Sequence, residues 1–167
     1  MADLTLDLYR ACKRNKRKTL DIKQNFNSDH GTGFLYPDYT GFWRKDNTFR
    51  APDVTTFTDD TGTEWIRGVN DTDPRTGRHY VSRNEGVSLS TTPGKFGYKF
   101  WFYFLLPEGT PVPDSLDVVQ TGTDQSHYAI RCKNLMRKDA YEGALNNLAR
   151  AAIAKATELK RASLYFS

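Results

Sequence analysis

The stretch YKFWFYFLL at residues 98–106 is apolar at nearly every position, and it decides the predicted fold. A strand covered on both faces has no polar face, so its sequence is a nearly continuous apolar run. The turn-forming residues Pro-Glu-Gly-Thr-Pro at 107–111 end it. We therefore predict a buried central β-strand over 98–106, around which the other elements pack.

Shorter runs before and after this stretch have the two-residue period of strands that bury one face. Residues 4–11 place three leucines on one face, and by the same period Arg10 falls on that apolar face. The alternating pattern predicts three more strands, at residues 86–92, 116–119 and 126–132.

A long helix is predicted over residues 138–161, because apolar residues recur there at helical spacing. Strands and helices do not alternate regularly, which argues against a parallel sheet. The length of 167 residues corresponds to about one domain. The sequence thus predicts a single α+β domain over residues 1–167, with mixed or antiparallel strands and a long C-terminal helix.

Aromatic residues make up 13% of the chain and compensate for few aliphatic ones. They gather in two stretches, 34–49 and 96–104. The second belongs to the predicted central strand. The first lies in a segment rich in turn-forming residues, so we expect it to form a pocket lid or a surface for a partner.

The net charge of +4 comes largely from five basic residues within positions 13–18, and the rest of the chain is nearly neutral. A nucleic-acid binder more often spreads positive charge over a whole face. No apolar run is long enough to span a bilayer, and no cleavable signal is evident, so we expect a protein without a membrane partner. Two cysteines without metal-ligand spacing and three scattered histidines predict no metal site.

Four places in the sequence are candidates for chemistry. Arg10 either contacts an anion in a cleft or pairs with groups across the sheet. Ser88 and Ser90 share a strand face, where hydroxyls line a groove or meet solvent. Arg50 is a further candidate, with a salt bridge to Asp53 as the alternative role.

The fourth place is the segment Asp124 to Ile130, in which Gln125 and His127 fall on one strand face. A lone histidine on a strand is either a structural side chain or a catalyst. The sequence contains no Gly-x-Ser-x-Gly motif, which argues against a serine hydrolase.

The order of these residues resembles the three-part signature of the ADP-ribosyltransferase fold: an arginine on the first strand, a Ser-x-Ser strand, and a polar group on a late strand. The chain is more closely similar to the Tse-two-like type VI secretion effector toxins of that superfamily. The similarity lies in LDLYRA at 6–11, RAPDV at 50–54, PEGTPVPDSL at 107–116 and HYAI at 127–130, followed by Met136 and the long helix.

The resemblance implies a pocket for NAD, the substrate, where two small sheets split apart. Arg10 and Arg50 are then expected to hold the phosphates, and Ser88 and Ser90 the nicotinamide ribose. An aromatic ring is expected to stack on nicotinamide, the candidates being Tyr80, Phe96, Tyr98 and Phe100. Ordinary members use a glutamate on the late strand, but no glutamate occurs from Ser115 to Ala140. Gln125 and His127 occupy that place.

We therefore expect a toxin that breaks the nicotinamide–ribose bond of NAD and transfers ADP-ribose to an unidentified acceptor in the target-cell cytoplasm. The resemblance also implies export without a cleavable signal, contact with secretion machinery, and a cognate immunity protein. Three alternatives stay open: an NAD glycohydrolase, a ribonuclease using His127, and a nucleic-acid or protein binding module that uses the basic run and the aromatic loop.

Overall fold

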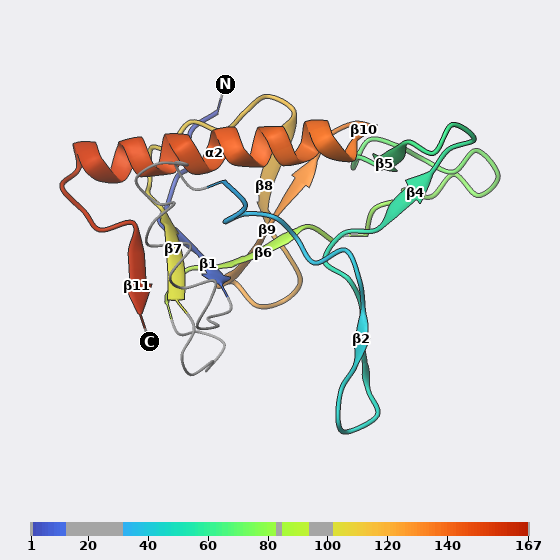
Figure 1. Ribbon diagram of the computed structural model, residues 1–167, viewed down its shortest axis with the longest axis horizontal. Helices are drawn as coiled ribbons and strands as arrows, with labels where there is room; N and C mark the ends of the chain where they lie inside the picture. The colour runs from blue at the N-terminus through green and yellow to red at the C-terminus, as the bar shows by residue number, and fades with distance from the viewer. Residues whose placement is uncertain (1, 13–31, 83–84, 94–101, 167) are drawn as a thin grey trace.

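The computed structural model of the protein describes residues 2–12, 32–82, 85–93 and 102–166 (Figure 1). Its centre is a six-stranded antiparallel sheet, in the order β11-β7-β1-β6-β9-β8. The strands are β1 (Leu8–Cys12), β6 (Val87–Ser90), β7 (Phe102–Leu106), β8 (Leu116–Gln120), β9 (His127–Cys132) and β11 (Leu164–Phe166).

Strand β7 is buried at all five positions, as the apolar run predicts. It pairs with β1 along its whole length, from Leu8 opposite Leu106 to Cys12 opposite Phe102. Its position is second from the edge, because β11 pairs with its outer side. The predicted residues 98–101 of this strand lie outside the described residues.

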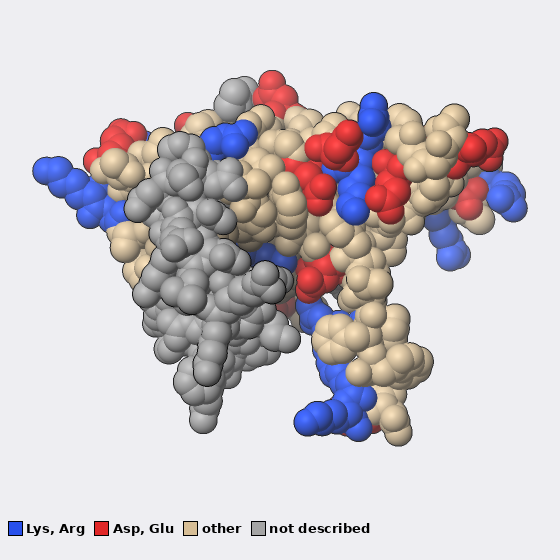
Figure 2. Space-filling view, viewed as in Figure 1, with Lys and Arg blue, Asp and Glu red and all other residues tan. Residues whose placement is uncertain are grey.

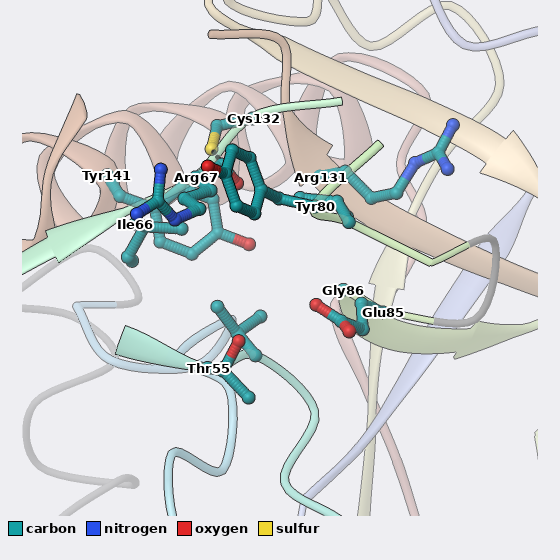
Figure 3. Close-up of a pocket in the computed structure, with 11 residues that line it drawn as sticks. Thr55, Ile66, Arg67, Tyr80, Glu85, Gly86, Arg131, Cys132 and Tyr141 are labelled. Atoms are coloured by element: carbon teal, nitrogen blue, oxygen red, sulfur yellow. Dashed lines mark hydrogen bonds between the residues drawn. The ribbon is translucent and has the colours of Figure 1, made fainter. Parts of the chain in front are cut away.

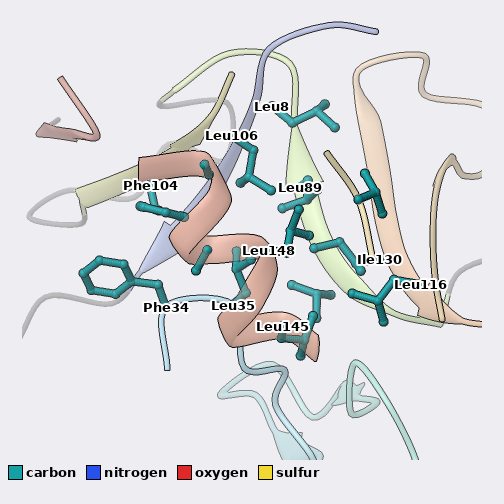
Figure 4. Close-up of a cluster of buried hydrophobic side chains, with 14 of the residues drawn as sticks. Leu8, Phe34, Leu35, Leu89, Phe104, Leu106, Leu116, Ile130, Leu145 and Leu148 are labelled. Atoms are coloured by element: carbon teal, nitrogen blue, oxygen red, sulfur yellow. The ribbon is translucent and has the colours of Figure 1, made fainter. Parts of the chain in front are cut away.

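Helix α2 (Lys138–Glu158) covers one face of the sheet (Figure 4). Phe104 and Leu106 of β7 pack in one apolar cluster with Leu145 and Leu148 of the helix, all four fully buried. Each such side chain contributes on the order of 1.5–3 kcal/mol through removal from water. Tyr103 and Leu105 point to the opposite face, where they pack with Tyr9. No helix among the described residues is long and apolar enough to cross a membrane.

Two smaller sheets extend from this body. A three-stranded antiparallel sheet has the order β10-β5-β4 and lies near the start of α2 (Figure 1). Its strands are β4 (Thr56–Thr58), β5 (Glu64–Ile66) and β10 (Met136–Arg137). A two-stranded hairpin, β2 (Phe42–Trp43) and β3 (Phe49–Arg50), projects away from the body. The α+β class with split sheets and a long C-terminal helix is confirmed.

The aromatic stretch 34–49 divides between two environments. Phe34 is buried and its ring contacts that of Phe104, with centroids 4.9 Å apart. In contrast, Phe42, Trp43 and Phe49 on the hairpin are 52%, 72% and 51% exposed. Part of the stretch therefore belongs to the core, and only the hairpin residues are available as a surface.

Candidate active site at the split between the sheets

The three strands that carry the signature residues lie side by side, in the order β1, β6, β9. Tyr9 pairs with Ser90, and Ser90 with His127. Residues that pair across strands share a face, so Ser88, Ser90 and His127 lie on one side of the sheet. Arg10 belongs to the other side, with Leu8, because side chains alternate along β1. Pairing of distant segments thus brings the predicted residues to neighbouring strands.

Arg10 is held by three groups. Its Nη1 donates to the Ser88 carbonyl oxygen at 3.1 Å, and its Nη2 donates to the Tyr36 carbonyl oxygen at 3.1 Å. The same Nη2 lies 3.6 Å from Asp53 Oδ2. The Arg10 side chain is only 12% exposed, so these contacts satisfy a charge that is largely removed from water.

Asp53 joins two of the candidate residues. Besides Arg10, its carboxylate contacts Arg50, whose Nη2 lies 3.4 Å from Oδ1. The Asp38 backbone N–H also donates to Oδ2 at 3.0 Å. Sequence reasoning named Asp53 only as an alternative partner for Arg50. It missed the link to Arg10, because that contact joins segments 43 residues apart in the chain.

The two serines differ in environment. The Ser90 side chain is fully buried, and its Oγ donates to the Thr92 carbonyl oxygen at 2.8 Å. Ser88 is half-buried, and no hydrogen bond of its hydroxyl to another described residue is found. Ser88 is therefore the one of the pair with a hydroxyl available to a ligand.

His127 lies half-buried at the start of β9, and its Nδ1 shares a hydrogen bond with the Thr121 hydroxyl. Burial lowers the pKa of His127, while the nearby Asp124 and Asp53 raise it and Arg50 lowers it further. The net shift is downward, so the ring is predominantly neutral at pH 7. It can make hydrogen bonds there but supplies no negative charge.

One candidate residue, Gln125, lies apart from this group in the structure. Gln125 was predicted to share a strand with His127, and this is wrong: it lies exposed in the turn before β9. The reason is that the Asp124 carboxylate accepts hydrogen bonds from the backbone and hydroxyl of Ser126, which forms a turn and delays the strand. Tyr98, Phe96 and Phe100 lie outside the described residues.

Arg10, Asp53 and Arg50 form what we call the Arg10 group. A cavity of about 160 Å³ opens next to it, between the three-stranded sheet and the adjoining ends of β6 and β9 (Figure 3). Two features join it to that group. Val54, which follows Asp53, lines the cavity, and the Tyr141 hydroxyl group on its wall is close enough for Arg10 and Asp53 to influence its pKa. The cavity is partly open to solvent, so a ligand can occupy it with one end and extend outward with the other.

The polar groups of this cavity come from several elements. The Arg67 guanidinium lies over the Tyr80 and Phe57 rings, 3.8 Å and 4.2 Å from their centroids. The Tyr141 hydroxyl donates to the Ile130 carbonyl oxygen at 3.0 Å. Figure 3 shows the Glu85 carboxylate pointing into the space. Of these, sequence reasoning named only Tyr80.

Burial raises the pKa of Glu85, against hydrogen bonds from Ser82 that lower it. The one signal that the sequence offered for this residue is its position just before Gly86, at the start of the Ser-x-Ser strand. No group of three or more metal-ligating side chains is found in the described part of the chain.

Comparison with known proteins identifies the family of the chain. The family model of the Tse2 ADP-ribosyltransferase toxin matches residues 6–157, which includes all three signature strands and nearly all of α2. No curated protein matches the sequence significantly. Since the family model spans most of the chain, the protein belongs to the Tse2 ADP-ribosyltransferase toxin family.

Proposed function

We propose that this ADP-ribosyltransferase toxin uses NAD in the cytoplasm of a target cell and transfers ADP-ribose to an acceptor there. The observation that carries the proposal is the Arg10–Asp53–Arg50 group beside a partly open cavity. NAD combines a small ring with a pyrophosphate, and guanidinium groups suit phosphate oxygens.

The residues divide the work by chemistry. Arg50 is 36% exposed and keeps N–H groups for a phosphate, while the buried Arg10 fixes Asp53 and the Ser88 strand in place. Ser88, supported by Ser90, hydrogen-bonds the nicotinamide ribose. His127, as a neutral ring, binds a ribose hydroxyl. Gln125, in its exposed turn, contacts the molecule that accepts ADP-ribose.

Of the four candidates for stacking on nicotinamide, Tyr80 lies in the described part of the chain, and Phe96, Tyr98 and Phe100 lie outside it. Tyr80 lines the cavity and its ring already covers Arg67. The choice matters because stacking fixes the ring plane, and with it the direction in which nicotinamide leaves.

Bond breaking between nicotinamide and ribose creates positive charge on the sugar. Groups placed in advance around this charge lower the barrier, because they need not reorganise during the reaction. The toxin reaches its target by secretion machinery, and the producing cell protects itself with an immunity protein that blocks the site.

The test is incubation with NAD labelled on the adenylate, alone and with cell extract. Label on a macromolecule supports transfer. Release of nicotinamide without labelled macromolecule supports an NAD glycohydrolase instead. If neither product forms, NAD chemistry is refuted.

Variants sharpen this assay. Ser88→Ala, His127→Ala and Arg10→Lys should each lose most of the activity, while Arg75→Ala, an exposed arginine outside the site, should keep it. Thermal unfolding of each variant separates lost chemistry from lost fold. Full activity in all three site variants would refute the assignment.

The projecting hairpin favours a second candidate function, binding to a nucleic acid or protein partner. The Trp43 and Phe49 rings lie 5.2 Å apart on it, both exposed. Figure 2 shows Lys and Arg side chains along one edge of this hairpin and at its tip, where Arg44 and Lys45 lie. Exposed rings stack on bases for about 1–3 kcal/mol each, and the cations attract phosphate.

Fluorescence anisotropy with a labelled single-stranded oligonucleotide tests nucleic-acid binding. Affinity that falls steeply with salt and is lost in Trp43→Ala supports it. If the oligonucleotide does not bind, the remaining candidate partner of this surface is a protein. Unchanged NAD chemistry in Trp43→Ala would show that the two functions are separate.

A further inference from the structure

A carboxylate, that of Glu85, points into the cavity from the segment just before β6 (Figure 3). We propose that Glu85 is the catalytic carboxylate, which opposes the positive charge that develops on the ribose when the nicotinamide bond breaks. This inference rests on the proposed function, since it assigns a residue to that same NAD reaction.

The backbone around Glu85 is fixed by its neighbour. The Gly86 N–H donates to the Asp53 carbonyl oxygen at 2.7 Å, and Gly86 has a φ of 142°. A Cβ atom at Gly86 would lie 2.7 Å from the Ile130 carbonyl oxygen. Only glycine fits this approach, so the chain enters β6 in one direction, with Glu85 beside the segment that carries Asp53.

Glu85 makes no ion pair with any residue in the described ranges. The charged and titratable groups that line the cavity with it are Arg67, Arg131, Tyr80, Tyr141 and Cys132. Arg131 pairs with Asp117 at 3.2 Å, and Figure 3 shows its guanidinium pointing away from the cavity.

Arg67 contacts two aromatic rings, and no ion pair joins it to Glu85 in the described part of the chain. Within the described residues, Glu85 thus has no cation at ion-pair distance. A half-buried carboxylate without an ion-pair partner attracts a cation from a ligand, and the attraction is stronger where water is partly excluded. Burial also raises the pKa of Glu85, although hydrogen bonds with Ser82 lower it in part.

The reaction supplies such a cation. The bond between ribose C1′ and the pyridinium nitrogen breaks, its electron pair goes to the ring, and nicotinamide leaves uncharged. The positive charge then resides on the ribose, next to the ionised Glu85. A lone pair of the acceptor or of water forms the new bond to C1′, and the proton of that nucleophile passes to solvent.

The experiment compares wild type with Glu85→Gln, which keeps the shape of the side chain and removes its charge. Glu108→Gln is the matched control, since Glu108 is exposed in the turn after β7. Nicotinamide release is measured over a range of NAD concentrations, and thermal unfolding confirms that both variants fold.

We expect kcat to fall about 100-fold or more in Glu85→Gln, the loss typical of removing one group that stabilises transition-state charge. KM should change little, and Glu108→Gln should match wild type. The wild-type rate should also rise with pH through a pKa above 4.5, the ordinary glutamate value, because the ionised form is needed.

The outcomes are distinguishable. A wild-type rate in Glu85→Gln, when wild type cleaves NAD, overturns this inference and leaves the proposed function intact. A rise in KM with unchanged kcat overturns it too, since Glu85 then only binds substrate. Failure of wild type to cleave NAD refutes the proposed function and the inference together.

Discussion

Replacement of Asp53 by asparagine should destabilise the protein substantially, because Asp53 joins the two arginines of the site. Asparagine keeps nearly the same volume and can still accept the Asp38 N–H bond. It removes the charge opposite Arg10, whose side chain is only 12% exposed and lies 3.6 Å away. A cation largely excluded from water then keeps only the Ser88 and Tyr36 carbonyl oxygens as partners.

Breaking a buried pair from one side typically costs about 3–5 kcal/mol. Arg10 keeps two hydrogen bonds, so we expect the lower end, about 3 kcal/mol. For a chain of this length each kcal/mol corresponds to roughly 2–4 °C, so the melting temperature should fall by roughly 6–12 °C. The Arg50 side of the pair is 36% exposed, and Arg50→Ala should cost no more than about 1 kcal/mol.

Urea denaturation of Asp53→Asn, Arg50→Ala, Arg10→Met and the Arg10→Met/Asp53→Asn double variant checks these values. The double variant should be less destabilised than the sum of its two single changes, because the second change removes the unpaired charge. A cost for Asp53→Asn below about 1 kcal/mol, or additive effects in the double variant, would show that the pair does not hold the site together.

Three further predictions concern titration, thiol reactivity and packing. As the pH falls below the ordinary histidine value of 6.5, the unfolded chain protonates His127 before the folded one, because burial lowers the pKa of His127 in the fold. The free energy of unfolding should therefore decline between pH 7 and the folded-state pKa, and urea denaturation of His127→Gln should show a shallower decline. Burial raises the pKa of Cys12 to about 12 and that of Cys132 to about 11. Iodoacetamide at pH 8 should modify both thiols slowly in the native protein and rapidly in urea, as mass spectrometry can measure. Leu145→Ala should lower the unfolding free energy by about 2–5 kcal/mol, since Leu145 is fully buried between α2 and the sheet, and a loss under 1 kcal/mol would contradict that packing.

Much of the fold could be predicted from local patterns. The run ending at Leu106 predicts a strand buried on both faces, and β7 has that character. The helical stripe predicts α2 from Lys138, although the helix ends at Glu158 rather than at residue 161. Its last turn is closed by Leu159 and Lys160, and Lys160 has a φ of 55°, which a continuing helix cannot contain.

The aromatic stretch 34–49 shows where local patterns fail. Phe34 and Trp43 are both large aromatic residues and are close in sequence. Phe34 is buried against β7, whereas Trp43 is 72% exposed. Which ring enters the core depends on the path of the chain after residue 32 and on the surface that α2 and β7 leave uncovered. Hydrophobicity alone cannot distinguish the two positions.

For the site, the sequence by itself determined the residue types and their order, namely Arg10, Ser88 and His127, each on a strand whose alternation is local. The tertiary structure alone decided the rest: that β1, β6 and β9 are neighbours, that Asp53 joins Arg10 to Arg50, that Gln125 lies in a turn, and that Glu85 faces a cavity. The physical reason is that strand period and helical stripe arise from residues a few positions apart. An ion pair or a cavity wall arises from segments that only the pairing of distant strands brings together.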